Sequence, residues 1–147
     1  MLPLEDALTQ MLNQLPFPTK TETLALTEAA DRVCAEDVVS PINVPSFDNS
    51  AMDGYAVRLA DLQQSMTLSV AGKSFAGNPF QGEWIAQSAV RIMTGAMIPE
   101  GADAVVIQED VTVNEDGTVT FSALPKANQN IRRIGEDVKK GDVVLHQ

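Results

Sequence analysis

Short apolar runs separated by glycine and proline turns fill the chain from Val38 onward, and this pattern constrains the fold more than any other feature. The runs are four or five residues long and rich in β-branched residues, which is typical of strands rather than helices. The expected strands are 67–70, 90–93, 104–108, 110–113 and 118–121. Strands of this length and spacing predict an antiparallel barrel or sandwich.

The strands expected at 110–113 and 118–121 flank the turn Asn-Glu-Asp-Gly at 114–117. Apolar and polar residues alternate on both sides of the turn, and Gly117 stands where a hairpin needs a positive φ. The sequence therefore predicts a β-hairpin here. A further strand is expected to begin at Val143.

The N-terminal part has the periodicity of a helix. Large apolar side chains recur at spacings of three, four and seven residues, which places them on one stripe of a helix that Pro16 would end. The stripe consists of Leu4, Leu8, Met11, Leu12 and Leu15. We expect it to pack into the hydrophobic core. A second short helix is predicted over 27–32, with Thr27 as its N-cap.

Charge and rare residue types exclude several classes of protein. The chain has 147 residues and a net charge of −10, which argues against binding of nucleic acid, because phosphate contacts need a basic face. Cys34 and His146 are the only residues of their types. A disulfide and a Cys/His zinc site within one chain are therefore excluded. A hydrolase that needs a histidine inside its fold is also disfavoured, because His146 is the penultimate residue.

Two features of the sequence predict a cytoplasmic protein without a membrane segment. No apolar run approaches the roughly 20 residues that span a bilayer. The first residues lack the basic and apolar regions of a signal peptide.

The basic residues are concentrated near the end of the chain. Residues 126–147 carry five basic and three acidic side chains, whereas 1–125 carry five basic and seventeen acidic ones. The lysines and arginines of this stretch can form an ordinary solvated face. Alternatively, Arg132 and Arg133 form an anion site, because guanidinium groups match the geometry of phosphate.

Two apparent motifs fail when their full patterns are tested. Gly-Lys-Ser at 72–74 resembles the end of a phosphate-binding loop, but Thr67 stands where that loop needs glycine, and Pro79 prevents the helix that should follow. The segment 48–54 is not an EF-hand loop, because Met52 occupies a position that needs an oxygen ligand.

Segment 48–54 nevertheless has unusual composition for a connector, with Asp, Asn, Ser and Asp in six positions. Such residues form tight turns by bonding to the nearby backbone. The alternative is a rigid loop that presents Asp53 as a general base or as a group that hydrogen-bonds to a ligand of a metal ion. Thr94 and Gly95 end a strand, and this pair is either a plain turn or a place where a hydroxyl contacts an oxyanion. The acidic pair at 136–137 can neutralise the arginines before it, or hold a cation beside their anion.

Five segments together resemble one known family, the molybdopterin molybdenumtransferases or MoeA family, which includes the E domain of gephyrin. The first is Pro-Ser-Phe-Asp-Asn-Ser-Ala-Met-Asp-Gly-Tyr-Ala-Val at 45–57, which is similar to the signature loop of the family. The others match in order and spacing at 71–77, 91–96, 99–105 and 130–137. The resemblance extends from about Leu4 to the last residue.

The resemblance implies an α+β, β-rich fold in two subdomains. Residues 1–44 with 138–147 would form an elongated N-terminal subdomain of helices and returning strands. Residues 45–137 would form an inserted antiparallel β subdomain, barrel- or roll-like. Proteins of the family are much longer, so a central α/β domain and a C-terminal β domain would be absent from this chain. The strand expected to begin at Val143 is unfinished at the end of the chain, which also suggests a fragment.

The resemblance implies insertion of molybdenum from molybdate into adenylylated molybdopterin, with release of AMP. Mg²⁺ would be the cofactor of the full-length enzyme, and the fragment would be inactive alone. The family also implies a homodimer that binds the pterin nucleotide, with the molybdopterin adenylyltransferase and molybdoenzyme-maturation proteins as further partners.

Site residues follow from the matching motifs. The resemblance implies catalytic roles for Asp53 and Thr94, with Asp53 orienting water or a hydrated magnesium ion. The substrate-binding residues would be Asp48, Asn49, Ser50, Arg133 and Asp137. No residue of this chain is expected to coordinate a metal directly.

A different class of function stays open beside the enzyme. The same β-rich surface would serve a stand-alone scaffold module that binds a protein partner without catalysis. In either case we expect the chain to self-associate through the N-terminal helix or the strand edges, because apolar surface normally covered by other domains would be exposed.

Overall fold

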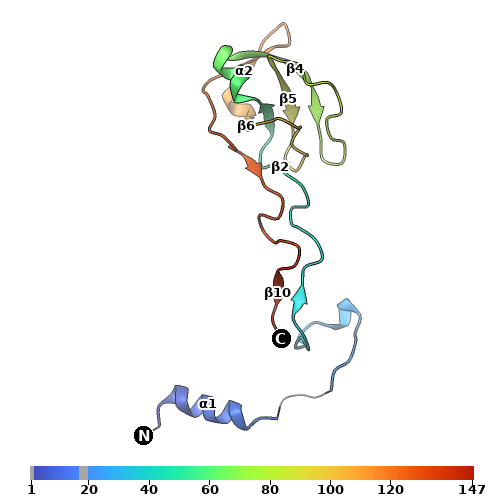
Figure 1. Ribbon diagram of the computed structural model, residues 1–147, viewed down its shortest axis with the longest axis vertical. Helices are drawn as coiled ribbons and strands as arrows, with labels where there is room; N and C mark the ends of the chain where they lie inside the picture. The colour runs from blue at the N-terminus through green and yellow to red at the C-terminus, as the bar shows by residue number, and fades with distance from the viewer. Residues whose placement is uncertain (1, 17–19) are drawn as a thin grey trace. The chain divides into compact units, whose positions relative to one another are not determined.

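The computed structural model describes residues 2–16 and 20–147 of the chain, and these fall into two units (Figure 1). One unit contains residues up to 38 together with 145–147, and the other contains residues 39–144. The predicted site residues all lie in the second unit. The expected insert at 45–137 lies inside that unit, and its boundaries stay a prediction.

The first unit begins with α1 (Leu4–Gln14), which confirms the predicted N-terminal helix. Its apolar stripe, however, does not lie in a core: the exposed fractions of its five large side chains run from 49% for Leu8 to 74% for Leu4. The expectation of core packing is therefore wrong for the described residues. Periodicity places apolar side chains on one stripe, but it does not provide the surface that covers them. No helix in the described ranges is long and apolar enough to cross a membrane.

The second predicted helix is wrong in length. The chain forms only one 3₁₀ turn, η1 (Leu26–Glu28), in place of a helix over 27–32. Ala25 rather than Thr27 precedes the turn, and no side chain caps it. Asp31 has a φ of +61°, which is incompatible with a right-handed helix that continues to residue 32.

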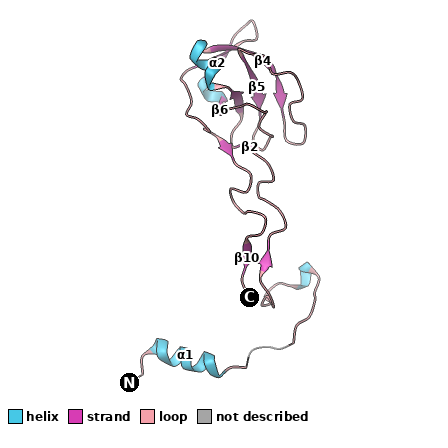
Figure 2. Ribbon diagram, in the orientation of Figure 1, coloured by secondary structure: helices cyan, strands magenta, loops and turns pink. Residues whose placement is uncertain are grey.

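A six-stranded sheet forms the centre of the second unit (Figure 2). Its strand order is β6-β3-β5-β4-β8-β7. The bounds are β3 (Gly54–Val57), β4 (Thr67–Ser74), β5 (Ser88–Ile92), β6 (Ala104–Ile107), β7 (Val111–Val113) and β8 (Val119–Phe121). The short helices α2 (Leu59–Gln64) and η2 (Gln108–Asp110) follow β3 and β6. The sequence predicted neither β3 nor α2.

The pairings confirm the β-rich α+β fold and add one feature to it. All neighbours in the sheet are antiparallel except β4 and β5, which run parallel with a register shift between Val70 and Gly72. The predicted hairpin is confirmed: β7 pairs with β8, and Val111 lies opposite Phe121. Residues 72–74 are the last residues of β4, so they form a strand and not a phosphate-binding loop.

The sheet is covered on both faces, and β3 supplies side chains to each. Tyr55 and Val57 belong to one buried cluster with Leu62 of α2. Ala56 belongs to a second cluster with Val90. All four residues of β3 are buried, because β5 and β6 pair with its two edges and a hydrophobic cluster covers each of its faces. This central position fixes the start of β3, and therefore also the position of Asp53, which directly precedes the strand.

Two long segments far apart in the sequence run side by side below the sheet, at 39–48 and 133–144 (Figure 1). The Val44 amide donates to the Val138 carbonyl at 2.8 Å, and the Ser40 amide donates to the Asp142 carbonyl at 2.8 Å. Two-stranded sheets lie at either end of the pair of segments. These sheets are β1 (Val38–Val39) with β10 (Val143–Leu145), and β2 (Asn49–Ser50) with β9 (Ile131–Arg132). The strand predicted at Val143 is thereby confirmed.

Candidate functional site

Asp53 and Thr94 are brought together by two neighbouring strands. Asp53 directly precedes β3, Thr94 lies two residues after the end of β5, and in this antiparallel pair Gly54 lies opposite Ile92. The backbone amide and the hydroxyl of Thr94 both donate to Oδ1 of Asp53, each at 2.7 Å. The two predicted catalytic residues are therefore in direct contact, although 41 positions separate them.

These bonds keep the Asp53 carboxyl ionised. The Thr94 hydroxyl and amide stabilise the anion and lower its pKa below the ordinary value, and the positive charge of Arg91 acts in the same direction. An acid with a lowered pKa is a weak base at neutral pH. Asp53 is therefore better suited to orienting water or a hydrated cation than to removing a proton.

Asn49 and Ser50 shape the loop from inside. Both are buried, with exposed fractions of 8% and 1%. The Ser50 hydroxyl donates to the Met52 carbonyl at 2.5 Å, and the Asn49 amide nitrogen contacts the Phe47 carbonyl at 3.4 Å. The Ser50 backbone also bonds to the loop after β5, since the Gly95 amide donates to its carbonyl at 2.8 Å. Direct contact of these two side chains with a substrate stays a prediction.

Asp48 and Arg133 form a second contact. Arg133 donates one guanidinium nitrogen to Asp48 Oδ2 and another to the Asn128 side chain, while the Ile134 amide donates to Asp48 Oδ1 at 2.8 Å. The Ile134 amide and the Arg133 charge lower the pKa of Asp48. An anion that binds Arg133 would share the guanidinium with this carboxylate.

Asp137 is paired with the other arginine of the predicted anion site. Arg132 donates one guanidinium nitrogen to both carboxylate oxygens of Asp137, at 2.5 and 2.6 Å, and Glu136 lies 3.6 Å from the same guanidinium group. The Asp137 carboxylate raises the pKa of Arg132. Both arginines are thus partly neutralised by acidic neighbours, as expected of a balanced polar surface.

The seven predicted site residues do not form one cluster, and five of them take part in three separate contacts, one of which is with Arg132, a residue outside the seven. These are Asp53 with Thr94, Asp48 with Arg133, and Asp137 with Arg132, while Asn49 and Ser50 are buried in the loop. Within the part of the chain that the structure describes, no group of three or more His, Cys, Asp or Glu side chains is placed to hold a metal ion.

Arg91 and Gln108 adjoin the Asp53 loop, and the sequence predicted no role for either residue. Arg91 donates to the Gly54 carbonyl at 2.9 Å and to Gln108 Oε1 at 2.6 Å. The backbone amide of Gln108 donates to the Asp53 carbonyl at 3.0 Å. One signal was available for Arg91: it is the only charged residue in the otherwise apolar or small run 88–93.

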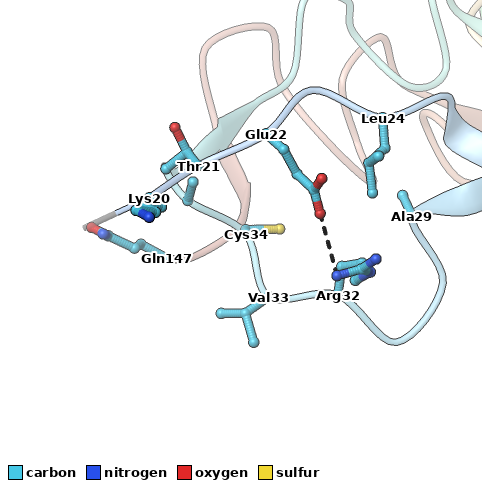
Figure 3. Close-up of a pocket in the computed structure, with 10 residues that line it drawn as sticks. Lys20, Thr21, Glu22, Leu24, Ala29, Arg32, Val33, Cys34 and Gln147 are labelled. Atoms are coloured by element: carbon cyan, nitrogen blue, oxygen red, sulfur yellow. Dashed lines mark ion pairs between the residues drawn. The ribbon is translucent and has the colours of Figure 1, made fainter. Parts of the chain in front are cut away.

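The first unit has an open hollow of about 880 Å³ that contains none of the predicted site residues (Figure 3). Glu22 and Arg32 form an ion pair of 3.3 Å in it, and Cys34 lies close by. Both charged side chains are 61% exposed, so water screens their attraction.

The chain resembles known proteins over nearly its whole length. Residues 2–147 match the family model described as the MoeA N-terminal region, domains I and II. A molybdopterin molybdenumtransferase of Haemophilus influenzae is 80% identical over 147 residues, which is 100% of this chain and 36% of that protein. The Bacillus subtilis molybdopterin molybdenumtransferase is 40% identical over 134 residues, covering 86% of this chain and 31% of the relative.

Solved structures agree with the sequence relatives. The crystal structure of the molybdopterin biosynthesis moeA protein from Pyrococcus horikoshii OT3 matches with a TM-score of 0.77 and 38% identity. The match covers 100% of this chain and 39% of that protein. The chain thus spans about a third of the length of the curated relatives it matches.

Proposed function

This chain belongs to the MoeA family, as its N-terminal region, and on that premise we propose that it serves an enzyme that inserts molybdenum from molybdate into adenylylated molybdopterin with release of AMP. The contact between Asp53 and Thr94 is the observation that carries the proposal. It joins two of the five motifs into one polar group on the surface of the sheet. The names of the relatives support the transfer of molybdenum to molybdopterin.

In this proposal Asp53 orients the groups that cleave the phosphoanhydride of the substrate. Thr94 occupies Oδ1 with two hydrogen bonds, whereas Oδ2 accepts none from the described residues. The carboxylate is ionised and held in one orientation, so Oδ2 is available to accept a proton of a bound water. Thr94 is the group that fixes this orientation.

Asp53 also fits the expected cofactor. Mg²⁺ in proteins keeps several waters and is bound by one or two carboxylates together with substrate phosphates. An ionised and partly exposed carboxylate meets that requirement through a water, and the rest of the shell would come from substrate and from other parts of the enzyme. When bound, the ion spreads the negative charge that develops on the phosphate. Asp53 would hold its water shell in place.

The remaining predicted residues would contact the substrate around this centre. Arg133 and Asp137 lie on the exposed loop that follows β9, and Asp48 links that loop to the signature segment. An anionic substrate would compete with Asp48 for Arg133. Asn49 and Ser50 would contribute by holding the loop rather than through exposed polar atoms.

Partners and location are proposed on the same family basis. We expect a homodimer that acts on the pterin nucleotide in the cytoplasm, with the molybdopterin adenylyltransferase and molybdoenzyme-maturation proteins as further partners. The exposed apolar stripe of α1 supports self-association. The 147-residue chain alone is expected to be inactive.

Asp53→Ala in the full-length enzyme tests the proposal. We expect molybdenum insertion to fall by about 100-fold or more, as for removal of a group that orients the reaction. Asp116→Ala is the matched control, because Asp116 also accepts an amide bond and a hydroxyl bond from one threonine, Thr118, in the hairpin turn. Its activity should stay within twofold of wild type. AMP release and cofactor loading of an acceptor apoenzyme are the two measurements.

Each unexpected outcome has a definite meaning. Normal insertion by folded Asp53→Ala would remove Asp53 from the catalytic groups but would leave the family membership intact. Absence of insertion by the wild-type enzyme under conditions where the Haemophilus influenzae relative is active would favour the scaffold module instead.

Self-association of the chain is tested by sedimentation. We expect the wild-type chain to form dimers or larger species at high concentration, and a double variant Leu8→Gln with Met11→Gln to remain monomeric, because both side chains lie on the exposed stripe of α1. Leu124→Gln is the control, since Leu124 is a similarly exposed leucine outside this helix. A strictly monomeric wild-type chain would overturn the expectation.

A further inference from the structure

We propose that Arg91 is a positioning residue for Asp53, which it holds through the backbone on either side of the β3 start; the role in catalysis rests on the proposed function, whereas the clamp itself does not. Arg91 lies on β5 opposite Tyr55 of β3. Its guanidinium group reaches across β3 to the residue that follows β6. One side chain thus links three adjacent segments at the end of the sheet where Asp53 lies.

The contacts of Arg91 are directed at the loop backbone. Nη1 donates to the carbonyl of Gly54, the residue after Asp53, at 2.9 Å. Nη2 donates to the side-chain Oε1 of Gln108 at 2.6 Å, and the backbone amide of Gln108 donates to the Asp53 carbonyl at 3.0 Å. The carbonyls of Asp53 and Gly54 are therefore both held, one by Gln108 directly and one by Arg91.

The guanidinium group is itself fixed in place. Its central carbon lies 5.0 Å from the centroid of the Tyr55 ring, and Tyr55 is buried in the core. In the described residues Arg91 forms no ion pair with any carboxylate, unlike Arg58, Arg132 and Arg133. Arg91 is half-buried, and its guanidinium group donates to a backbone carbonyl and a side-chain amide oxygen instead of a carboxylate. Its contacts therefore hold the loop backbone in position and do not neutralise its charge.

The charge of Arg91 has a second consequence for the same group. It lies close enough to Asp53 to favour the carboxylate form, in addition to the two bonds from Thr94. Other charged groups adjoin the network: Lys73 lies beside Arg91 on β4, and Glu109 accepts a bond of 3.4 Å from Gln108. The hydrogen bonds of the Arg91 guanidinium group and its positive charge are two separate effects on Asp53, and substitutions can remove them separately.

Two substitutions separate them in the 147-residue chain. Arg91→Lys keeps the charge and loses the planar fork, whereas Arg91→Gln loses the charge as well. We expect hydrogen exchange of the Gln108 backbone amide to become about tenfold faster in both variants, because the Asp53 carbonyl that accepts its bond is no longer held in place. We expect the pKa of Asp53, measured by carboxyl ¹³C NMR, to rise in Arg91→Gln alone, because the positive charge that favours the carboxylate is lost.

Arg58→Lys is the matched control. Arg58 is also half-buried, and it stacks on Trp84 at 4.7 Å as Arg91 stacks on Tyr55, but it contacts no residue of the Asp53 loop. Neither the Gln108 amide nor the Asp53 pKa should change in it. The Asn114 amide, which bonds within the hairpin, serves as an internal reference for general loss of stability.

The full-length enzyme supplies the catalytic part of the test. Arg91→Lys should lower kcat for insertion by about tenfold with little change in KM, because the substrate still binds while Asp53 is less well oriented. Unchanged Gln108 exchange in both Arg91 variants would overturn the clamp. Faster exchange with unchanged kcat would overturn the catalytic consequence, and it would do so independently of the result for Asp53→Ala. If Arg91→Gln fails to fold, Gln108→Ala removes the side-chain acceptor of Arg91 but keeps the backbone amide that donates to the Asp53 carbonyl, and exchange of that amide should again become faster.

Discussion

Two aspartates of this chain have nearly the same bonds but different surroundings. Asp53 accepts the amide and the hydroxyl of Thr94, and Asp116 accepts the amide and the hydroxyl of Thr118. The same two causes lower the pKa of each carboxyl. Asp116 and its threonine, however, are two residues apart in a hairpin turn, whereas 41 positions separate the other pair. A lowered pKa and a threonine partner therefore do not mark a site by themselves.

The difference lies in what each pair needs from the rest of the fold. The hairpin aspartate requires only a local turn, as such residues commonly form. The Asp53 pair exists because β3 and β5 are neighbours, and the backbone around it is held by Gln108 and Arg91. Assembly from distant segments distinguishes the candidate site from the turn.

The largest expected difference between the two regions concerns a glycine in each. A Cβ on Gly54 would lie 1.9 Å from the Val106 carbonyl oxygen, a backbone atom of the neighbouring strand. We expect Gly54→Ala to cost on the order of 3 kcal/mol or more, because the sheet cannot separate there without losing hydrogen bonds. Gly117 has a φ of +82° and open space around it, so Gly117→Ala should cost only about 1 kcal/mol.

Urea denaturation of both variants measures this contrast. Similar losses of unfolding free energy would mean that the Asp53 loop tolerates displacement as easily as the hairpin turn, and the comparison would then fail. A larger loss for Gly54→Ala would support a rigid site backbone.

Local signals predicted the elements that depend on local sequence. The stripe of α1, the turn at 114–117 and the strands beside it were all confirmed. In contrast, the sequence predicts a loop at 45–57 and no strand where β3 lies. Gly-Tyr-Ala-Val has no alternation, because a buried cluster covers each face of this strand, one with Tyr55 and Val57 and the other with Ala56. Only the pairing with distant segments makes it a strand.

The site shows the same division. The family resemblance named Asp53 and Thr94, but no spacing in the sequence indicates that the two touch. Arg132 and Arg133 are adjacent in the sequence, which predicts a shared anion site, yet Arg132 ends β9, Arg133 begins the loop after it, and the two bind different carboxylates. The apolar stripe of α1 predicts packing into the core, but the structure leaves it exposed. Periodicity does not show what covers a stripe.

A smaller effect is expected from loss of the threonine hydroxyls. Thr94→Val removes the first of the two bonds that lower the pKa of Asp53, so that pKa should move back toward its ordinary value while that of Asp116 stays unchanged. Thr118→Val should do the reverse. Carboxyl NMR titration of the two variants gives both values in each. A change at the distant aspartate in either variant would show that the two regions are coupled.

The smallest expected effect is the acid dependence of stability, in which the two aspartates should be alike. A carboxyl whose pKa is lower in the folded than in the unfolded chain stabilises the fold above the unfolded value, about 3.9, and this stabilisation is lost as pH falls through the folded value. Asp48, Asp53 and Asp116 all have lowered pKa values, so the urea midpoint should fall below about pH 4. Asp53→Asn and Asp116→Asn should each reduce that fall slightly and by similar amounts, because the bonds replaced are the same. A much larger change for Asp53→Asn would mean that its carboxylate stabilises the fold through groups besides Thr94. Equal changes would mean that the two carboxylates differ in their place in the assembled site and not in the strength of their bonds.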